Sequence, residues 1–186
     1  SQTTPISIEG GDGHDIILGT NVNDQILGGW GDDTINGGSG DDILKGQGGQ
    51  NTYQFAKGGG QDHVVTSYYY GESDSVIEFI DVTDITKLRF ERHELALKII
   101  IIETGDSVTI DNLYASTNSN QTQLNANYEQ KISLLKLADE SVINLDSVHI
   151  YMQTITEEAD IYVADELANT VNGLGGNDQI YGLAGE

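Results

Sequence analysis

Residues 28–46 read "GGWGDDTINGGSGDDILKG", a stretch made largely of glycine and aspartate with single aliphatic residues between them. The glycines lose much conformational entropy when they are ordered, the neighbouring aspartates repel one another, and little apolar surface is available for burial. An ordinary hydrophobic core cannot form from such a segment alone. The stretch therefore indicates that an additional source of stability holds the fold together.

A nine-residue period runs through this part of the chain. Written in rows from residue 10, the sequence reads "GGDGHDIIL", "GTNVNDQIL", "GGWGDDTIN", "GGSGDDILK" and "GQGGQNTYQ". The sixth column holds Asp15, Asp24, Asp33, Asp42 and Asn51. The eighth column holds Ile17, Ile26, Ile35, Leu44 and Tyr53, and Ile8 precedes them by one row. A strict internal period of this kind is typical of a stacked solenoid.

Each row divides into a turn and a short strand. Glycine in columns two and four permits left-handed backbone, so the first six residues are expected to be turn, and the last three a strand with column eight pointing inward. If successive strands lie on opposite sides, two rows form one coil. Ile17 then stacks with Ile35 and Tyr53 in one sheet, and Ile8 with Ile26 and Leu44 in the other. The sequence therefore predicts an all-β fold, a parallel two-sheet β-roll with a narrow core.

The stacked aspartates require a counter-ion. One buried aliphatic side chain per row offsets only part of the entropy lost by nine ordered residues, and the carboxylate ladder adds repulsion. Carboxylate and carbonyl oxygens without histidine or cysteine select calcium rather than zinc or copper, and magnesium prefers a compact octahedral shell that retains water. The repeat predicts calcium ions bound between the turns.

The overall charge agrees with a cation as partner. The 186 residues carry 30 Asp plus Glu against 8 Lys plus Arg, a formal net charge of −22, which disfavours nucleic acid and anionic membrane surfaces. The absence of cysteine excludes disulfides and thiolate metal sites. The first residues show no signal peptide pattern, and the longest apolar stretch, Ile99 to Ile102, is too short to cross a bilayer. We expect no transmembrane segment.

The segments "GGDGHD", "GGWGDD" and "GGSGDD" match the GGxGxDxUx nonapeptide, so the chain resembles the RTX (repeats-in-toxin) family. The resemblance implies that each calcium lies between one turn and the turn two rows later. The earlier row would supply the carbonyls of columns two and four with its column-six carboxylate. The later row would supply the carbonyls of columns one and three with its own column-six side chain.

This implied pattern gives four sites in the first repeat block. The first would use Gly11, Gly13 and Asp15 with Gly28, Trp30 and Asp33. The second would use Thr20, Val22 and Asp24 with Gly37, Ser39 and Asp42. The third would use Gly29, Gly31 and Asp33 with Gly46, Gly48 and Asn51. In the fourth, "KGGGQDHVV" restores the pattern out of phase, so that Lys57, Gly59 and Asp62 would join Gly38, Gly40 and Asp42.

Two rows depart from the family pattern. "GTNVND" has Thr20 and Val22 where glycine is expected, which predicts strain in that turn. Asn51 stands where a carboxylate is expected, which predicts a weaker site.

The remainder of the chain divides at two places, so we expect a β-roll over 1–65, a β-rich capping segment over 66–153 and the start of a second repeat block over 154–186. The middle contains strand patterns in "KLRFER", "ELALKIIII", "VTIDNLY", "KISLLKL" and "VINL", with hairpin turns at "ETGDS" and "ADES". Their arrangement resembles the segment that closes a repeat block in RTX haemolysins and adenylate cyclase toxins. We expect a compact β unit that covers the open end of the roll.

The ninefold phase returns after Ile155, with Tyr162, Val171 and Ile180 in one column. The calcium ligands expected in this truncated block are Asp160, Gly173, Gly175 and Asp178, and its repeats could stack between molecules.

Two segments are similar to catalytic motifs, but each lacks a required residue. "HELAL" at 93–97 lacks the second histidine of a zinc protease, and "GESDS" at 71–75 lacks the closing glycine of a nucleophile elbow. The sequence therefore predicts a non-enzymatic, calcium-binding structural segment of a large RTX toxin or adhesin that is secreted by a type I machinery and folds outside the cell. The alternatives are an adhesin module that binds glycan or peptide through Tyr68–Tyr70 or Trp30, and the carboxyl tail of an RTX protease or lipase.

Overall fold

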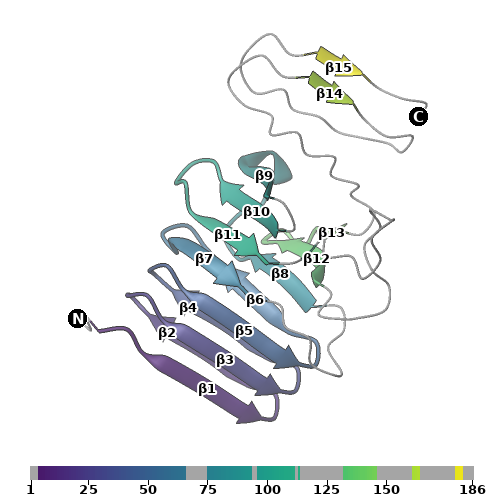
Figure 1. Cartoon of the computed structure of the whole chain (residues 1–186). Helices are drawn as coiled ribbons and strands as arrows, with labels where there is room; N and C mark the ends of the chain where they lie inside the picture. Colours follow the sequence, from purple (N-terminus) through teal and green to yellow (C-terminus); the bar gives the residue numbers. More distant parts are fainter. Residues whose placement is uncertain are drawn as a thin grey trace.

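The computed structural model describes residues 4–65, 75–93, 96–111, 113, 132–145, 161–163 and 179–181. Its first part is a roll of two facing sheets whose strands alternate along the chain (Figure 1). One sheet begins with β1 (Ser7–Asp12), β3 (Gln25–Trp30), β5 (Ile43–Gly48) and β7 (Gln61–Val64). The other begins with β2 (Ile16–Thr20), β4 (Thr34–Gly38), β6 (Thr52–Phe55) and β8 (Ser75–Phe79). All these strands pair in parallel, which confirms the predicted all-β roll.

The register of the pairs places the eighth column of the repeat in the core. Ile17 pairs with Ile35 and Ile35 with Tyr53 in one sheet. In the other sheet, Ile8 pairs with Ile26, Ile26 with Leu44 and Leu44 with Val64. From Ile17 to Val64 these side chains are buried, and Ile8 on the edge strand is partly buried. The predicted inward column is therefore confirmed.

The division of each row into turn and strand was wrong in one respect. The strands begin at column seven but continue into the next row, to column two in β2 and β4 and to column three in β3 and β5. Only about three residues of each row are left for the turn. Parallel pairing across coils explains the extension, because the glycine backbones of Gly11 and Gly29 continue the ladder past the aliphatic residues.

Left-handed backbone occurs where the sequence indicated it. The glycines of columns two and four have positive φ, for example 101° at Gly11 and 129° at Gly13. Gln47, in column two, also adopts a positive φ of 69°. Thr20 and Val22 do not adopt positive φ, so the strain predicted for their turn is absent. The backbone of that turn therefore differs from that of the glycine turns, and the turn forms hydrogen bonds of its own.

The middle segment adds strands to the same two sheets. β11 (Ser107–Ile110) pairs in parallel with β7, and β12 (Ile132–Leu137) pairs in parallel with β8. The predicted hairpins are confirmed: β10 (Ala96–Ile101) pairs antiparallel with β11, and β13 (Val142–Asn144) pairs antiparallel with β12. β9 (Leu88–His93), preceded by the 3₁₀ turn η1 (Ile85–Lys87), completes the first sheet beside β10.

The expected compact β unit is thus a continuation of the roll rather than a body with sheets of its own. In each sheet one more parallel strand, β11 or β12, lies next to the repeat strands, and its antiparallel partner, β10 or β13, lies beyond it. The core is continuous across this junction, where the rings of Phe55 and Phe79 pack with centroids 6.0 Å apart. The domain boundaries at 65 and 153 remain a prediction.

The second repeat block contributes β14 (Ile161–Val163) and β15 (Gln179–Tyr181), which pair in parallel. Tyr162 is the partner of Ile180, as the return of the ninefold phase predicts. Within the described residues, the structure contains no helix with the length and apolarity needed to cross a membrane.

Candidate metal centres

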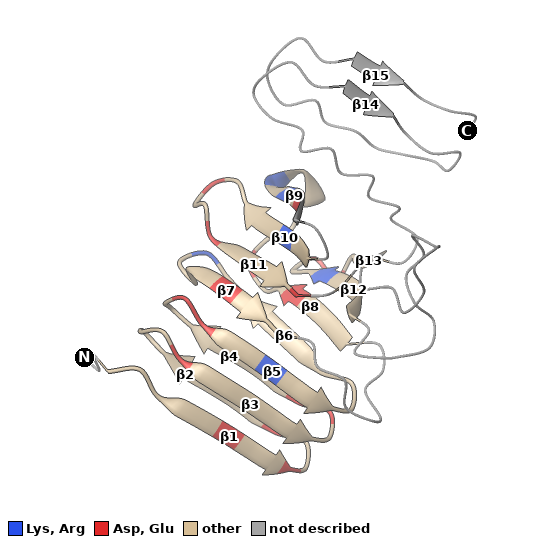
Figure 2. Ribbon diagram, viewed as in Figure 1, with Lys and Arg blue, Asp and Glu red and all other residues tan. Residues whose placement is uncertain are grey.

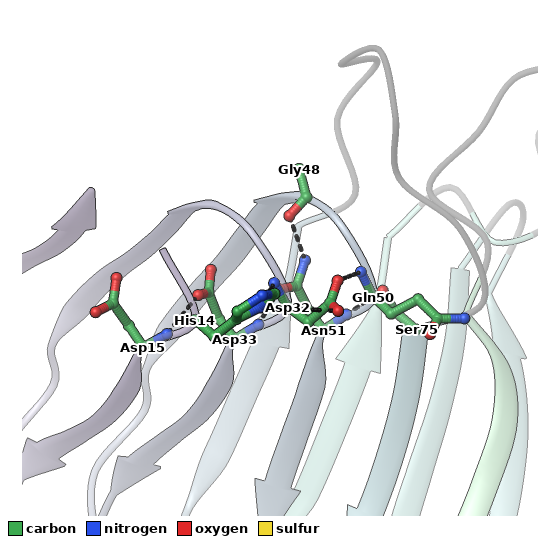
Figure 3. A network of polar contacts seen from close by, with 8 residues as sticks. All are labelled: His14, Asp15, Asp32, Asp33, Gly48, Gln50, Asn51 and Ser75. Atoms are coloured by element: carbon green, nitrogen blue, oxygen red, sulfur yellow. Dashed lines mark hydrogen bonds and ion pairs between the residues drawn. The ribbon is translucent and has the colours of Figure 1, made fainter. Parts of the chain in front are cut away.

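The column-six side chains form a ladder along one edge of the roll (Figure 3). The backbone N–H of Asp15 donates to Asp33 Oδ1 at 2.9 Å, one coil further on. In the same way the N–H of Asp33 donates to Asn51 Oδ1 at 3.0 Å, and the N–H of Asn51 donates to Ser75 Oγ at 3.0 Å. One oxygen of each side chain is therefore used to join its coil to the preceding coil.

A second ladder follows the opposite edge of the roll. The N–H groups of Ile6, Asp24 and Asp42 donate to the Oδ1 atoms of Asp24, Asp42 and Asp62 at 3.0, 2.7 and 3.0 Å. The aspartates Asp24, Asp33, Asp42 and Asp62 are buried, with exposed fractions of 0% at Asp42 and 5% at Asp62, whereas Asp15 in the first coil is partly exposed. Stacked acidic residues thus lie inside the turns rather than on the solvent side.

The second carboxylate oxygen is unpaired at three of these positions. Asp15 Oδ2, Asp33 Oδ2 and Asp42 Oδ2 are buried and have no hydrogen-bond partner. A buried acceptor without a donor costs about 1–3 kcal/mol, and more when it carries charge. Because native proteins pair nearly all such atoms, these three oxygens indicate a missing positive group.

A positive group would fit in the space beside the glycines of column one. A Cβ on Gly10 would lie 2.6 Å from Asp15 Oδ2 and would also meet the carbonyl oxygen of Gly28. A Cβ on Gly28 would meet Asp33 Oδ2 and lie 2.7 Å from the carbonyl oxygen of Gly46. Carboxylate and carbonyl oxygens thus approach the same small space between coils, and this donor set fits a hard cation such as calcium.

Sequence reasoning missed this role of column one. The signal was present, because glycine occupies the first column of every row from residue 10 to residue 46. The sequence predicted a backbone role for the glycines of columns two and four, where φ is positive, but not the steric role of Gly10 and Gly19.

The residues of the first predicted site are brought together between adjacent coils. The N–H of Gly13 donates to the carbonyl oxygen of Trp30 at 2.7 Å. The carbonyls of Gly11 and Gly13 approach Gly29 and Gly31 of the next coil so closely that a Cβ on either glycine would clash.

The fourth predicted site has a related arrangement on the other edge. The N–H of Gly40 donates to the carbonyl oxygen of Gly59 at 2.7 Å, and the carbonyl of Gly38 would lie 3.7 Å from a Cβ on Gly59. The backbone N–H of Lys57 donates to Asp81, and its Nζ forms an ion pair with Glu103. Asp106, which the sequence did not single out, accepts from the N–H groups of Gly58 and Gly60 and so fixes the long turn.

The second and third predicted sites already contain internal donors. In the second, Asp24 Oδ2 accepts hydrogen bonds from Thr20 N–H and Thr20 Oγ1, both at 2.7 Å, and the Thr20 carbonyl accepts from the N–H of Ser39. The carbonyl of Gly37 lies against Gly19, as its counterparts do in the other coils. In the third, Asn51 Nδ2 donates to the carbonyl oxygen of Gly48 at 3.5 Å. The N–H of Val22 donates to Thr20 Oγ1 at 3.4 Å, and the Val22 carbonyl lies against Gly40, as the Gly13 carbonyl lies against Gly31.

The predicted ligands of the second block, Asp160, Gly173, Gly175 and Asp178, lie outside the described residues, as do Tyr68–Tyr70.

The pKa values of the ladder carboxyls differ with these contacts. Burial raises the pKa of Asp42 to about 6 and that of Asp62 to about 7, and neighbouring aspartates add to both shifts. Burial likewise raises the pKa of Asp33. Burial also acts on Asp24, but the hydrogen bonds from Ile6 and Thr20 outweigh it, and the pKa of Asp24 is lowered. Without a cation, three of the ladder carboxyls are therefore poorly stabilised as anions and Asp24 is well stabilised.

An outer ladder in column five supports the turns from the solvent side (Figure 3). The N–H of Asp32 donates to His14 Nδ1, and the N–H of Gln50 donates to Asp32 Oδ1, both at 2.8 Å. Asn23 and Asp41 accept in the same way on the other edge. Side chains of column five thus accept hydrogen bonds from the following coil, whereas side chains of column six accept them from the preceding coil.

The acidic residues of the roll gather mainly at the turns that join the two sheets (Figure 2). Among the described residues, no group of three or more His, Cys, Asp or Glu side chains could hold a metal ion. An ion between the coils would therefore depend on one or two carboxylates together with backbone carbonyls, as the repeat pattern implies.

Comparison with known proteins agrees with this geometry. The family model described as the RTX calcium-binding nonapeptide repeat matches the chain in four copies, over residues 7–26, 27–64 and 156–186. No curated protein matches the chain significantly. Among solved structures, the extracellular lipase LipA from Serratia marcescens is similar at 15% identity and a TM-score of 0.32. That match covers 98% of this chain but 25% of the lipase, so this chain spans about a quarter of its length. Residues 7–64 and 156–186 therefore match the repeat that this family model describes, the RTX calcium-binding nonapeptide.

Proposed function

We propose that this chain is a calcium-binding structural segment of a larger RTX toxin or adhesin, secreted by a type I machinery and folded outside the cell. One observation carries the proposal: Asp15, Asp33 and Asp42 each hold a buried carboxylate oxygen without a partner, in stacked turns lined by carbonyls. The chain would act through its folded shape and not through catalysis.

The residues that would hold the ions are the three aspartates and the carbonyls of the glycines beside them. When bound, calcium supplies positive charge to oxygens that otherwise repel one another across a coil spacing. The chain itself supplies the Oδ1 hydrogen bonds that align the coils, and the glycines that leave room beside Oδ2.

This arrangement couples folding to the location of the protein. At the low calcium level of a cytosol the unpaired carboxylates oppose stacking, which suits export of an unfolded chain. Outside the cell, sites of the extracellular class, with Kd of roughly 10⁻⁴–10⁻³ M, fill at millimolar calcium, and their binding energy becomes folding energy. Folding outside would also prevent return through the channel.

Circular dichroism of the chain with calcium titrated in tests this proposal. We expect little β signal in chelator and a cooperative gain of β structure as calcium enters the millimolar range, with magnesium as the control ion. A complete β spectrum in chelator that does not change with calcium would contradict the proposal.

A second candidate function is an adhesin-type binding module. Trp30 favours it, because this residue is 55% exposed at the end of β3 and its ring lies over Gly48 of the next coil. Binding to a glycan or peptide array that Trp30→Ala abolishes, with calcium-dependent folding intact, would support this candidate. Equal binding by both proteins would remove Trp30 from consideration.

A further inference from the structure

The turn from Thr20 to Asp24 differs from the other turns of the roll in its hydrogen bonds. Asp24 Oδ2 occupies the same place as the unpaired oxygens of Asp15, Asp33 and Asp42, beside the column-one glycine of its own row, Gly19. At Asp24, however, this oxygen accepts from both the N–H and the hydroxyl of Thr20 at 2.7 Å. Asp24 Oδ1 accepts from the N–H of Ile6, so neither oxygen of this carboxylate lacks a donor.

The backbone explains why this turn differs from the equivalent turn of the next coil. Thr20 stands in column two without a positive φ, and its N–H points at the carboxylate of its own turn. In the next coil Gly38 holds the same column with a φ of 96°, and its N–H donates instead to Asn36 Oδ1. Asp42 Oδ2 is then left unpaired. The threonine side chain adds a second donor that glycine cannot provide.

We propose that Thr20 takes the place of a calcium ion in this turn, so that the second site implied by the repeat, Thr20, Val22 and Asp24 with Gly37, Ser39 and Asp42, does not bind calcium. This inference rests on the proposed function, because it assumes that the unpaired oxygens of Asp15, Asp33 and Asp42 do bind ions. Two donors from Thr20 satisfy Asp24 Oδ2, and the N–H of Ile6 satisfies Asp24 Oδ1, in the absence of metal.

The assignment has a consequence for folding. The turn at Thr20 joins β2 to β3, near the amino-terminal end of the roll, and the Asp24 carboxylate also holds the segment that leads into β1 through Ile6. This first coil on one edge is complete in hydrogen bonds without calcium. The coil that follows it on the same edge is not, since Asp42 has an unpaired oxygen.

Calcium stoichiometry of the full 186-residue chain, measured by isothermal titration calorimetry, tests the assignment. Asp15→Asn removes an unpaired oxygen that belongs to one predicted site only, and we expect it to reduce the number of bound ions by one. Asp24→Asn changes the equivalent position of the neighbouring row, which also belongs to one predicted site, and we expect no change in the number of bound ions. Loss of one ion by Asp24→Asn, matching the loss in Asp15→Asn, would overturn the inference.

A gain-of-site variant gives an independent answer if Asp24→Asn does not fold. Thr20→Gly combined with Val22→Gly restores the glycine pattern, "GGNGND", and removes both the hydroxyl and the constraint on φ. We expect this variant to bind one more calcium ion per chain than the unaltered protein. An unchanged number of ions would overturn the inference. If the unaltered chain binds no calcium at all, the proposed function itself fails, and the two failures are thereby distinguished.

Discussion

Asn51 Nδ2 and Asp33 Oδ2 occupy equivalent places one coil apart, each against the column-one glycine of its own turn, Gly46 and Gly28. The oxygen is unpaired, whereas the nitrogen donates to the carbonyl of Gly48. Because Asn51 Oδ1 must accept from the N–H of Asp33, the amide can only present its nitrogen on the other side. A donor therefore ends the row of unpaired oxygens on this edge, just before the ladder reaches Ser75.

Asn51→Asp should make the calcium-free chain less stable and more dependent on calcium. The substitution keeps the Oδ1 bond to Asp33 but replaces a donor by a further buried acceptor, which costs about 1–3 kcal/mol. Urea unfolding at a series of calcium concentrations at which both proteins are folded measures the two effects: the unfolding midpoint of the variant should be lower at the lowest concentration and should rise more steeply with calcium. Equal midpoints of variant and unaltered protein at every concentration would contradict this view of Asn51.

Gly28→Ala should abolish calcium binding at the adjoining coil, because its Cβ would meet Asp33 Oδ2 and the carbonyl of Gly46. Gly105→Ala, outside the repeat turns, is the control: its φ of 81° makes alanine unfavourable by about 1–2 kcal/mol, but no atom lies within 4 Å of the added Cβ. Calorimetry should show a lost ion in Gly28→Ala and unchanged stoichiometry in Gly105→Ala. Normal binding by Gly28→Ala would show that column one does not border the ion.

Stability should respond to pH in opposite directions with and without calcium. The pKa values of Asp42 and Asp62 in the calcium-free fold, about 6 and about 7, lie above the ordinary value of 3.8, so the folded chain binds more protons than the unfolded chain. This contribution is fully present below pH 4 and is lost as the pH rises through 6 to 7. In chelator we expect more folded structure at pH 5 than at pH 8.

In saturating calcium the same carboxyls must be ionised, so acidification should release ions and lower stability. Thermal melts followed by circular dichroism at both pH values, with and without calcium, measure the reversal. The same pH trend in both conditions would contradict it.

Ile35→Ala should lower the free energy of unfolding of the calcium-loaded chain by about 2–5 kcal/mol, because Ile35 is fully buried between its partners in β2 and β6. Ile16→Ala is the matched control, since Ile16 is 88% exposed on β2, and it should change stability by less than about 0.5 kcal/mol. Similar effects of the two substitutions would mean that the narrow core contributes little.

The period of nine was sufficient to predict the sheet order and the register of the roll. Ile17, Ile35 and Tyr53 lie eighteen residues apart in turn, and that spacing translates directly into parallel pairs. Hairpins in the middle segment were also predictable, because "ETGDS" and "ADES" are turn signals between apolar runs. The repeat spacing and the turn sequences are therefore sufficient to predict the register of the roll and the two hairpins.

Other features depend on distances between coils, which the pattern does not give. The continuation of the roll by β11 and β12 follows from pairings over long separations in sequence, such as Ser107 with Gln61. The role of Thr20 was likewise hidden. Its departure from glycine indicated strain, yet a change of backbone path removes the strain and turns its N–H and hydroxyl toward Asp24.

A crystal structure of the chain grown in calcium, with ions located by anomalous scattering, tests the central claim most directly. The account predicts an ion at about 2.3–2.6 Å from each of Asp15 Oδ2, Asp33 Oδ2 and Asp42 Oδ2. A folded roll in saturating calcium with no ion at any of these three oxygens would contradict it.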